Sequence, residues 1–191
     1  MKTEKTEGQL LSEELSYKPV NAGEKLTDAE MKKADNFCED YKVFLDHAKT
    51  EREAVSYAVK LAEKKGFVPY DPDHTYQAGD RVYYNNRGKA VILAVIGKKP
   101  LKEGVRIVAA HIDSPRLDLK PNPLYEDNDL ALFKTHYYGG IKKYQWTAIP
   151  LALHGVVAKK DGTVISVAIG EDYNDPIFCV TDLLPHLASE Q

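Results

Sequence analysis

The chain has 191 residues, of which 43% are hydrophobic and 29% are charged, and this balance is ordinary for a soluble globular protein. Its formal net charge of −3 gives no reason to expect nucleic acid or an anionic membrane as a partner. The longest apolar run, AVILAVIG, is too short to span a bilayer, and the polar start of the chain shows no apolar segment of a secretory signal, so we expect a cytoplasmic protein.

The first 26 residues are expected to form a polar arm that becomes ordered when it docks, with several leucines and a tyrosine available to pack. Cys38 and Cys179 lie far apart, in segments that look helical and strand-like. Sparse cysteines of this kind are usually unpaired. We therefore expect two buried free thiols in a reducing compartment.

Two helices are predicted next, at residues 27–48 and 50–65. Apolar residues recur at helical spacing in both segments, and Gly66 is a typical stop signal after the second. Each segment opens with a capping box, in which a threonine and a glutamate three residues later bond to each other's backbone. The two boxes are Thr27 with Glu30 and Thr50 with Glu53.

The pattern then changes to strands. Residues 81–97 read as a β-hairpin whose turn is Asn85 to Gly88, because asparagine and glycine tolerate the left-handed backbone of such turns. The segment VRIVAA, residues 105–110, reads as the next strand. Continuous apolar residues in AVILAVI and VRIVAA indicate strands covered on both faces. We therefore predict an α/β fold, with a central mixed sheet and helices on its faces.

After Pro123 the sequence becomes mainly strand-like. Asp161-Gly162 is a strong hairpin signal between two apolar strands, and residues 176–191 add a short strand and a turn or short helix. We predict two parts: residues 1–119 as an α/β part, and residues 120–191 as an inserted, mainly β module.

A metal site is suggested by His111 and Asp113, which follow the apolar run 105–110. Residues two apart share a face of a strand, and imidazole is a common ligand for divalent metals. A nearby carboxylate can hold the other ring nitrogen and fix the tautomer. The sequence thus predicts His111 as a metal ligand at the carboxyl end of a central strand, with Asp113 close to its ring. A hydrogen-bonded structural histidine would fit the same pair.

Other candidate residues have simpler interpretations. Ser114 is not flanked by the glycines of a hydrolase nucleophile elbow, so we expect it in a turn. The segment THYYGGIKKY, which includes His136, is expected to be a loop with aromatic anchors at a domain junction. The remaining histidines have structural or solvent-facing interpretations: His47 and His74 are expected to face solvent, and His154 and His186 to be satisfied structural residues.

Five segments of the chain resemble the bacterial branch of the aspartyl-aminopeptidase family of zinc exopeptidases: KTEREAV, NRGKAVILAVIG, AAHIDSPRLDLKPNPLYED, THYYGGIKKYQW and DLLPHLA. The likeness runs from about Tyr17 to Gln191. It implies a catalytic α/β domain that holds two metal ions, interrupted by a β-rich dimerisation domain. It also implies self-association into a dodecamer and peptides as substrates.

The resemblance also assigns roles to residues. His111 matches the family's first metal ligand, Asp113 the catalytic carboxylate that orients it, and His186 a histidine that binds substrate in a neighbouring subunit. The family's other ligands match nothing here and are expected beyond Gln191. Zn²⁺ is the expected cofactor, and imidazole and carboxylate ligands also accept Mn²⁺ or Co²⁺.

The predicted function is therefore that of the N-terminal portion of a metalloaminopeptidase, which releases N-terminal residues, with the family's preference for acidic ones. With one metal ligand, the 191-residue chain is expected to be inactive alone. The rival hypothesis is a non-enzymatic fragment that keeps only an oligomerisation surface. A third, an unrelated binding module, would need the central block to match by chance.

Overall fold

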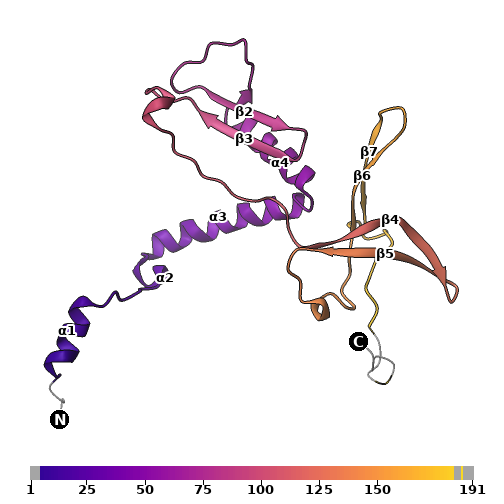
Figure 1. The fold of residues 1–191 in the computed structure, drawn as a ribbon, viewed down its shortest axis with the longest axis horizontal. Helices are drawn as coiled ribbons and strands as arrows, with labels where there is room; N and C mark the ends of the chain where they lie inside the picture. The colour runs from indigo at the N-terminus through magenta and orange to yellow at the C-terminus, as the bar shows by residue number, and fades with distance from the viewer. Residues whose placement is uncertain (1–4, 183–185, 187–191) are drawn as a thin grey trace. The chain divides into compact units, whose positions relative to one another are not determined.

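The computed structural model describes residues 5–182 and 186. The chain divides into two units, Met1–Val43 and Phe44–Gln191. Figure 1 shows the order of their helices and strands along the chain. Within the described residues, no helix combines the length and the apolar character needed to cross a membrane.

The first unit is helical, with α1 at Glu7–Leu15, α2 at Ala22–Lys25 and most of α3, which runs over Asp28–His47 into the second unit. The expected arm therefore contains regular structure, and α1 has its own capping box. The capping box predicted before α3 is confirmed, because the backbone N–H of Thr27 donates to Glu30 at 2.8 Å and the backbone N–H of Glu30 donates to Thr27 Oγ1 at 3.4 Å.

Most apolar side chains of α3 are exposed, while Phe44 near its end is half-buried and packs edge-on against Tyr57 of the next helix. No residue of this helix is buried, and Phe37 is 71% exposed. Cys38 is free but exposed, and so is Cys179 near the other end of the chain, so the prediction of buried thiols is wrong. The periodicity identified the helix correctly, but it cannot show whether another element packs on the apolar face.

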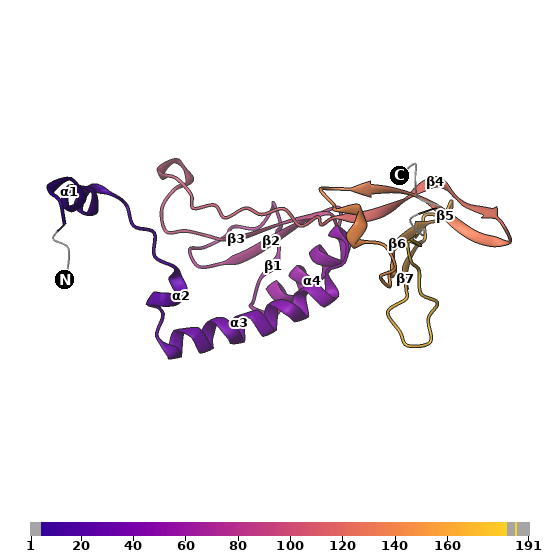
Figure 2. The ribbon, with the colours of Figure 1, turned by 90° about the horizontal axis from the view of Figure 1, so that it is seen from below.

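The second unit begins with α4, Glu51–Lys64, which starts at the predicted capping box of Thr50 and ends before Gly66, a glycine with a φ of +80°. Its buried residues Ala54, Val55 and Ala62 face a three-stranded sheet, and Figure 2 shows α4 along one face of that sheet. On the strand side, Val82 and Tyr83 complete the buried core of the described residues.

That sheet consists of β1 (Val68–Pro69), β2 (Arg81–Asn86) and β3 (Ala90–Val95) in this spatial order. β1 and β2 are parallel and β2 and β3 are antiparallel, so the predicted α/β fold with a mixed sheet is confirmed. Of the helices predicted on the faces of the sheet, α4 packs against it. The predicted hairpin turn is also confirmed, since Arg87 and Gly88 both have left-handed φ angles, of 56° and 68°.

The next predicted strand does not form. After a short 3-10 helix at Leu101–Glu103, residues 104–115 have no regular secondary structure, and Val108 is fully exposed. A strand exists only where a neighbouring backbone pairs with it. No described residue makes a backbone hydrogen bond with residues 105–115, so the prediction of a strand over 105–110 is wrong.

A long hairpin follows, formed by β4 (Arg116–Asp127) and β5 (Leu130–Tyr138). Its two-residue turn is Asn128-Asp129, with φ angles of 51° and 62°. The pairing shifts between Leu119 and Leu124, where two prolines supply no N–H for the ladder. The segment around His136 was predicted as a loop, but it lies in β5, and that prediction is wrong.

After a 3-10 helix at Lys143–Gln145, the predicted second hairpin forms from β6 (Leu153–Ala158) and β7 (Val164–Ile169), with Asp161-Gly162 in its turn. The expected short strand near residue 178 appears only as single bridges. The described residues thus form three separate sheets. The predicted domain boundary after residue 119 falls inside β4; this boundary and the dimerisation role of the β-rich part remain predictions.

Candidate metal-ligand site

His111 lies in the irregular segment 104–115, and its ring is held by Asp113. The ring nitrogen Nδ1 is 2.9 Å from the backbone oxygen of Asp113 and 3.1 Å from its Oδ1. Both oxygens accept hydrogen bonds, so in the neutral ring Nδ1 carries the proton and Nε2 carries the lone pair. The predicted proximity of Asp113 to the ring is confirmed, whereas the predicted position at the end of a central strand is wrong.

The lone pair of His111 is accessible. The His111 side chain is 83% exposed, and none of the described residues makes a hydrogen bond with Nε2. A neutral imidazole with one nitrogen fixed by a carboxylate and the other free is the form in which histidine binds metals. The donor chemistry of this residue therefore fits a zinc ion.

Asp113 is held in its ionised form by its neighbours. The hydroxyl of Tyr138 donates to Oδ2 at 2.7 Å, and this bond is the main reason that the pKa of Asp113 lies below its usual value. Its own backbone N–H and His111 lower the pKa further, while partial burial opposes them. The same bond to Asp113 raises the pKa of the Tyr138 hydroxyl, which stays protonated as a donor.

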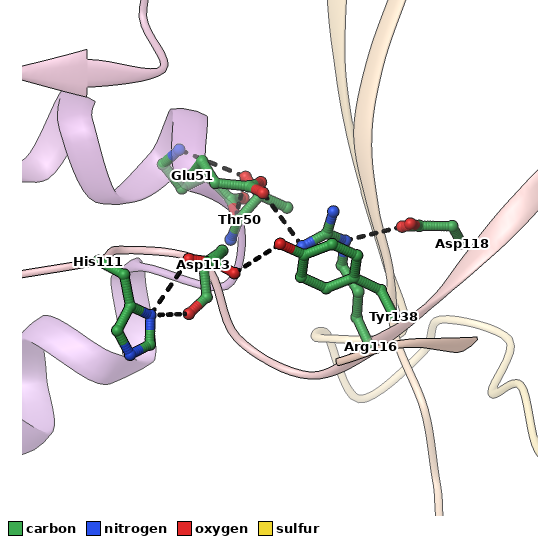
Figure 3. A network of polar contacts seen from close by, with 8 residues as sticks. Thr50, Glu51, His111, Asp113, Arg116, Asp118 and Tyr138 are labelled. Carbon is green, nitrogen blue, oxygen red and sulfur yellow. Dashed lines mark hydrogen bonds and ion pairs between the residues drawn. The ribbon is translucent and has the colours of Figure 1, made fainter. Parts of the chain in front are cut away.

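Arg116 fixes Tyr138 from the opposite strand (Figure 3). These two residues are direct partners in the pairing of β4 and β5, and the guanidinium carbon lies 4.1 Å from the centre of the tyrosine ring. Arg116 also pairs with Asp118 at 2.7 Å and with Glu51, the first residue of α4, at 3.1 Å. A cation–π contact and two ion pairs thus determine where the tyrosine lies.

A second histidine–carboxylate cluster has no signal in the sequence. His154 of β6 is 13% exposed; its Nδ1 lies 2.9 Å from Glu53 and its Nε2 lies 2.8 Å from Glu171, just after β7. Burial opposes protonation of the ring, but the two carboxylates outweigh it and raise the pKa of His154 above 6.5. Because both nitrogens must donate, His154 acts as a bridging cation, which agrees with the structural role expected for it.

The described residues contain no group of three or more histidine, cysteine, aspartate or glutamate side chains that could hold a metal ion. A catalytic zinc usually has three protein ligands and an open position. Within this part of the chain, His111 therefore supplies one ligand. His186 is exposed, and the residues on both sides of it lie outside the described part, while His47 and His74 are exposed as expected.

An open groove of about 990 Å³ lies between α4, β4 and the hairpin of β6 and β7. Trp146 and His154 line it, and His111 does not. The candidate ligand and this groove are therefore separate features of the second unit.

An imidazole with Nδ1 held by a carboxylate and with Nε2 free is the arrangement in which metal-ligating histidines are usually found. The family model of "Aminopeptidase I zinc metalloprotease (M18)" matches residues 44–191. This is more than half of the chain, and the chain therefore belongs to the M18 aminopeptidase family, as the resemblance in its sequence predicts.

Individual relatives agree with this assignment. A protein of Clostridium acetobutylicum described as a probable M18 family aminopeptidase 1 is 55% identical over 175 residues, which are 90% of this chain and 38% of the relative. The structure of aminopeptidase I from Borrelia burgdorferi B31 matches with a TM-score of 0.81 and 43% identity, over 87% of this chain and 41% of that one.

A third match is the structure of an M18 family aminopeptidase from Thermotoga maritima, with a TM-score of 0.81 and 46% identity, over 92% of this chain and 38% of that one. These structures share the α/β fold of the described residues. The chain thus spans less than half the length of the relatives that it matches.

Proposed function

We propose that the chain contributes the first ligand of the metal centre of an aminopeptidase, which removes N-terminal residues from peptides. Membership of a family described as zinc metalloproteases supports the reaction class. The observation that carries the assignment of His111 is its ring geometry: Nδ1 is bonded to Asp113 and Nε2 is free. The other ligands of the centre come from outside the described residues.

Each residue has a defined part in this proposal. When bound, zinc supplies Lewis-acid polarisation of the scissile carbonyl. His111 holds the ion through Nε2, and Asp113 keeps the proton on Nδ1 so that the lone pair stays on Nε2. His186 contacts the substrate. The same proposal includes a second metal ion beside the first. Mn²⁺ or Co²⁺ can take the place of zinc in it, and the preferred N-terminal residues of the substrate are acidic.

Self-association without catalysis is a second candidate function. It is favoured by the single metal ligand and by large apolar side chains that are fully exposed in the described residues, such as Val108 and Tyr173. A yeast structure of this fold is described as an mApe1 dodecamer. An assembly of many copies is accordingly part of the proposal for this chain.

The ligand role is tested by zinc binding to the purified chain. We expect weak binding, with zinc-dependent shifts in the NMR signals of the His111 ring, because one imidazole provides little affinity. The His111→Ala variant should lose this binding. His74→Ala, which removes another exposed histidine, is the matched control and should keep it. Equal binding by all three proteins would contradict the ligand assignment.

The reaction is tested with aspartyl and leucyl chromogenic amides in the presence of zinc, manganese or cobalt. The chain alone should release no product. Co-expression with the part of the Clostridium relative beyond the aligned segment should give release that a chelator abolishes and that His111→Ala lacks.

The relative's own aligned segment, co-expressed in the same way, is the positive control for this experiment. If that control is active and our chain is not, the aminopeptidase proposal is wrong and self-association remains. If the chain alone is active, and both a chelator and His111→Ala abolish the activity, its ligand set is larger than one residue.

A further inference from the structure

We propose that Tyr138 is a positioning residue for His111, acting through Asp113, and that Arg116 holds Tyr138 in the required place. This inference rests on the proposed role of His111 as a metal ligand. It assigns a function to two residues of the β4–β5 hairpin, which follows directly after the segment that carries the ligand (Figure 3).

The first step concerns the segment that carries His111, which few hydrogen bonds connect to the rest of the described chain. Residues 105–115 have no regular structure and make no backbone hydrogen bond to any described residue. Their side chains make one hydrogen bond outside the segment within the described part of the chain, from the Tyr138 hydroxyl to Asp113 Oδ2. This bond is therefore the polar tether that places Asp113, and with it His111.

The second step is the division of the Asp113 carboxylate between two partners. Oδ2 lies 2.7 Å from the Tyr138 hydroxyl, and Oδ1 lies 3.1 Å from His111 Nδ1. A bond of 2.7 Å between a hydroxyl and an ionised carboxylate is short and charge-assisted. Fixing one oxygen limits rotation of the whole group, so Tyr138 keeps the other oxygen directed at the imidazole.

The third step is the rigidity of Tyr138 itself. The turn at Asn128-Asp129 and the pairing of β4 with β5 place Tyr138 directly opposite Arg116. The guanidinium lies over the ring, and its other contacts, to Asp118 and Glu51, are themselves ion pairs. A planar guanidinium can stack on the ring and bind both carboxylates, whereas a lysine ammonium cannot match this arrangement.

The experiment compares Tyr138→Phe with Tyr137→Phe, in the full chain. The first variant removes the hydroxyl and keeps the ring beneath Arg116. The second removes the hydroxyl of the adjacent residue of β5, whose neighbour at 4.8 Å from the ring is Lys143. NMR of the labelled His111 ring reports which nitrogen carries the proton, at a pH where the ring is neutral.

We expect the wild-type chain and Tyr137→Phe to show the Nδ1–H tautomer, and Tyr138→Phe to show a mixture in which Nε2–H increases. Zinc titrations of the same samples should show binding that is weaker by about tenfold in Tyr138→Phe, the lower end of the usual effect of outer partners of a metal ligand. Arg116→Gln should shift the tautomer in the same direction, with Arg116→Lys between it and the wild type.

The outcomes separate this inference from the proposed function. If Tyr138→Phe and Tyr137→Phe leave the same tautomer and the same zinc affinity, Tyr138 has no positioning role, even if His111→Ala abolishes binding. If His111→Ala leaves zinc binding unchanged, the ligand assignment fails, and the tautomer measurement still decides whether Tyr138 orients the ring. A change in stability without a change in tautomer would also contradict the positioning role.

Discussion

His111 and His154 both contact carboxylates, but they differ in how many ring nitrogens are engaged. His111 bonds through Nδ1 to a residue two positions away, and its side chain is 83% exposed. His154 bonds through both nitrogens, to Glu53 and Glu171, and is 13% exposed. A free nitrogen is compatible with metal binding, while an imidazole that donates twice is a structural cation. The contact to a carboxylate alone does not distinguish the two roles.

The largest expected effect comes from removing the structural histidine. His154→Ala leaves the half-buried Glu53 and the exposed Glu171 without their shared, largely buried cation, so we expect the free energy of unfolding to fall by about 2 kcal/mol. Urea unfolding measured by the fluorescence of Trp146, the single tryptophan of the chain, checks this value, because Trp146 lines the same groove as His154. A loss no larger than that of His74→Ala would show that the bridge contributes nothing to stability.

Glu53 has two roles, which two substitutions separate. Its Oε2 accepts from the backbone N–H of Thr50 in the capping box, and its Oε1 binds His154. Glu53→Gln keeps a cap but removes the charge, and should cost about 0.5 kcal/mol, whereas Glu53→Ala removes both and should cost about 1.5 kcal/mol. The same urea unfolding series measures both values. If both variants lose the same free energy of unfolding, the capping bond has no effect on stability. If Glu53→Gln loses none, the ion pair with His154 does not contribute to stability.

The features that the sequence predicted correctly depend on short-range signals. The capping boxes at Thr27 and Thr50 and the turns at Gly88 and Gly162 each involve residues within a few positions of one another. The contact between His111 and Asp113 is of the same kind. Such signals are present in the order of residues whatever else packs nearby.

The features that the sequence missed depend on what lies nearby in space. An apolar run at 105–110 shows hydrophobicity but not whether a neighbouring strand exists, and none of the described residues provides one. The β4–β5 hairpin has prolines in a strand and a turn without glycine, although Asn128-Asp129 is a recognisable signal for a two-residue turn. Tyr138 and Asp113 are 25 residues apart, and Glu53 and His154 are 101 apart, so neither pair has a sequence signature.

The pH dependence of stability gives a finer test of the comparison. Glu53 and Glu171, from α4 and from the end of β7, raise the pKa of His154 above 6.5 despite its burial. A histidine whose folded pKa is raised adds stability that is fully present below the unfolded pKa and is lost as the pH rises through the folded one. We therefore expect the wild-type chain to lose stability between about pH 6 and about pH 8 relative to His154→Gln, by less than about 1 kcal/mol. Parallel pH profiles of the two proteins, measured by urea unfolding, would mean that His154 is not a bridging cation.

The smallest expected effect on stability belongs to His111→Ala, and this result is as informative as the largest. The His111 side chain is exposed, and among the described residues it bonds only to Asp113, within an irregular segment. Its loss should therefore change the free energy of unfolding by no more than about 0.5 kcal/mol. Zinc binding should be lost in the same variant and kept in Glu53→Gln, which weakens the other cluster while leaving the chain folded. If one histidine binds metal and the other stabilises the fold, zinc titration will show lost binding in His111→Ala and kept binding in Glu53→Gln. Urea unfolding will show the larger loss of stability in Glu53→Gln. A large destabilisation by His111→Ala would instead make His111 a structural residue like His154, because a side chain that mainly presents a lone pair to solvent contributes little to folding.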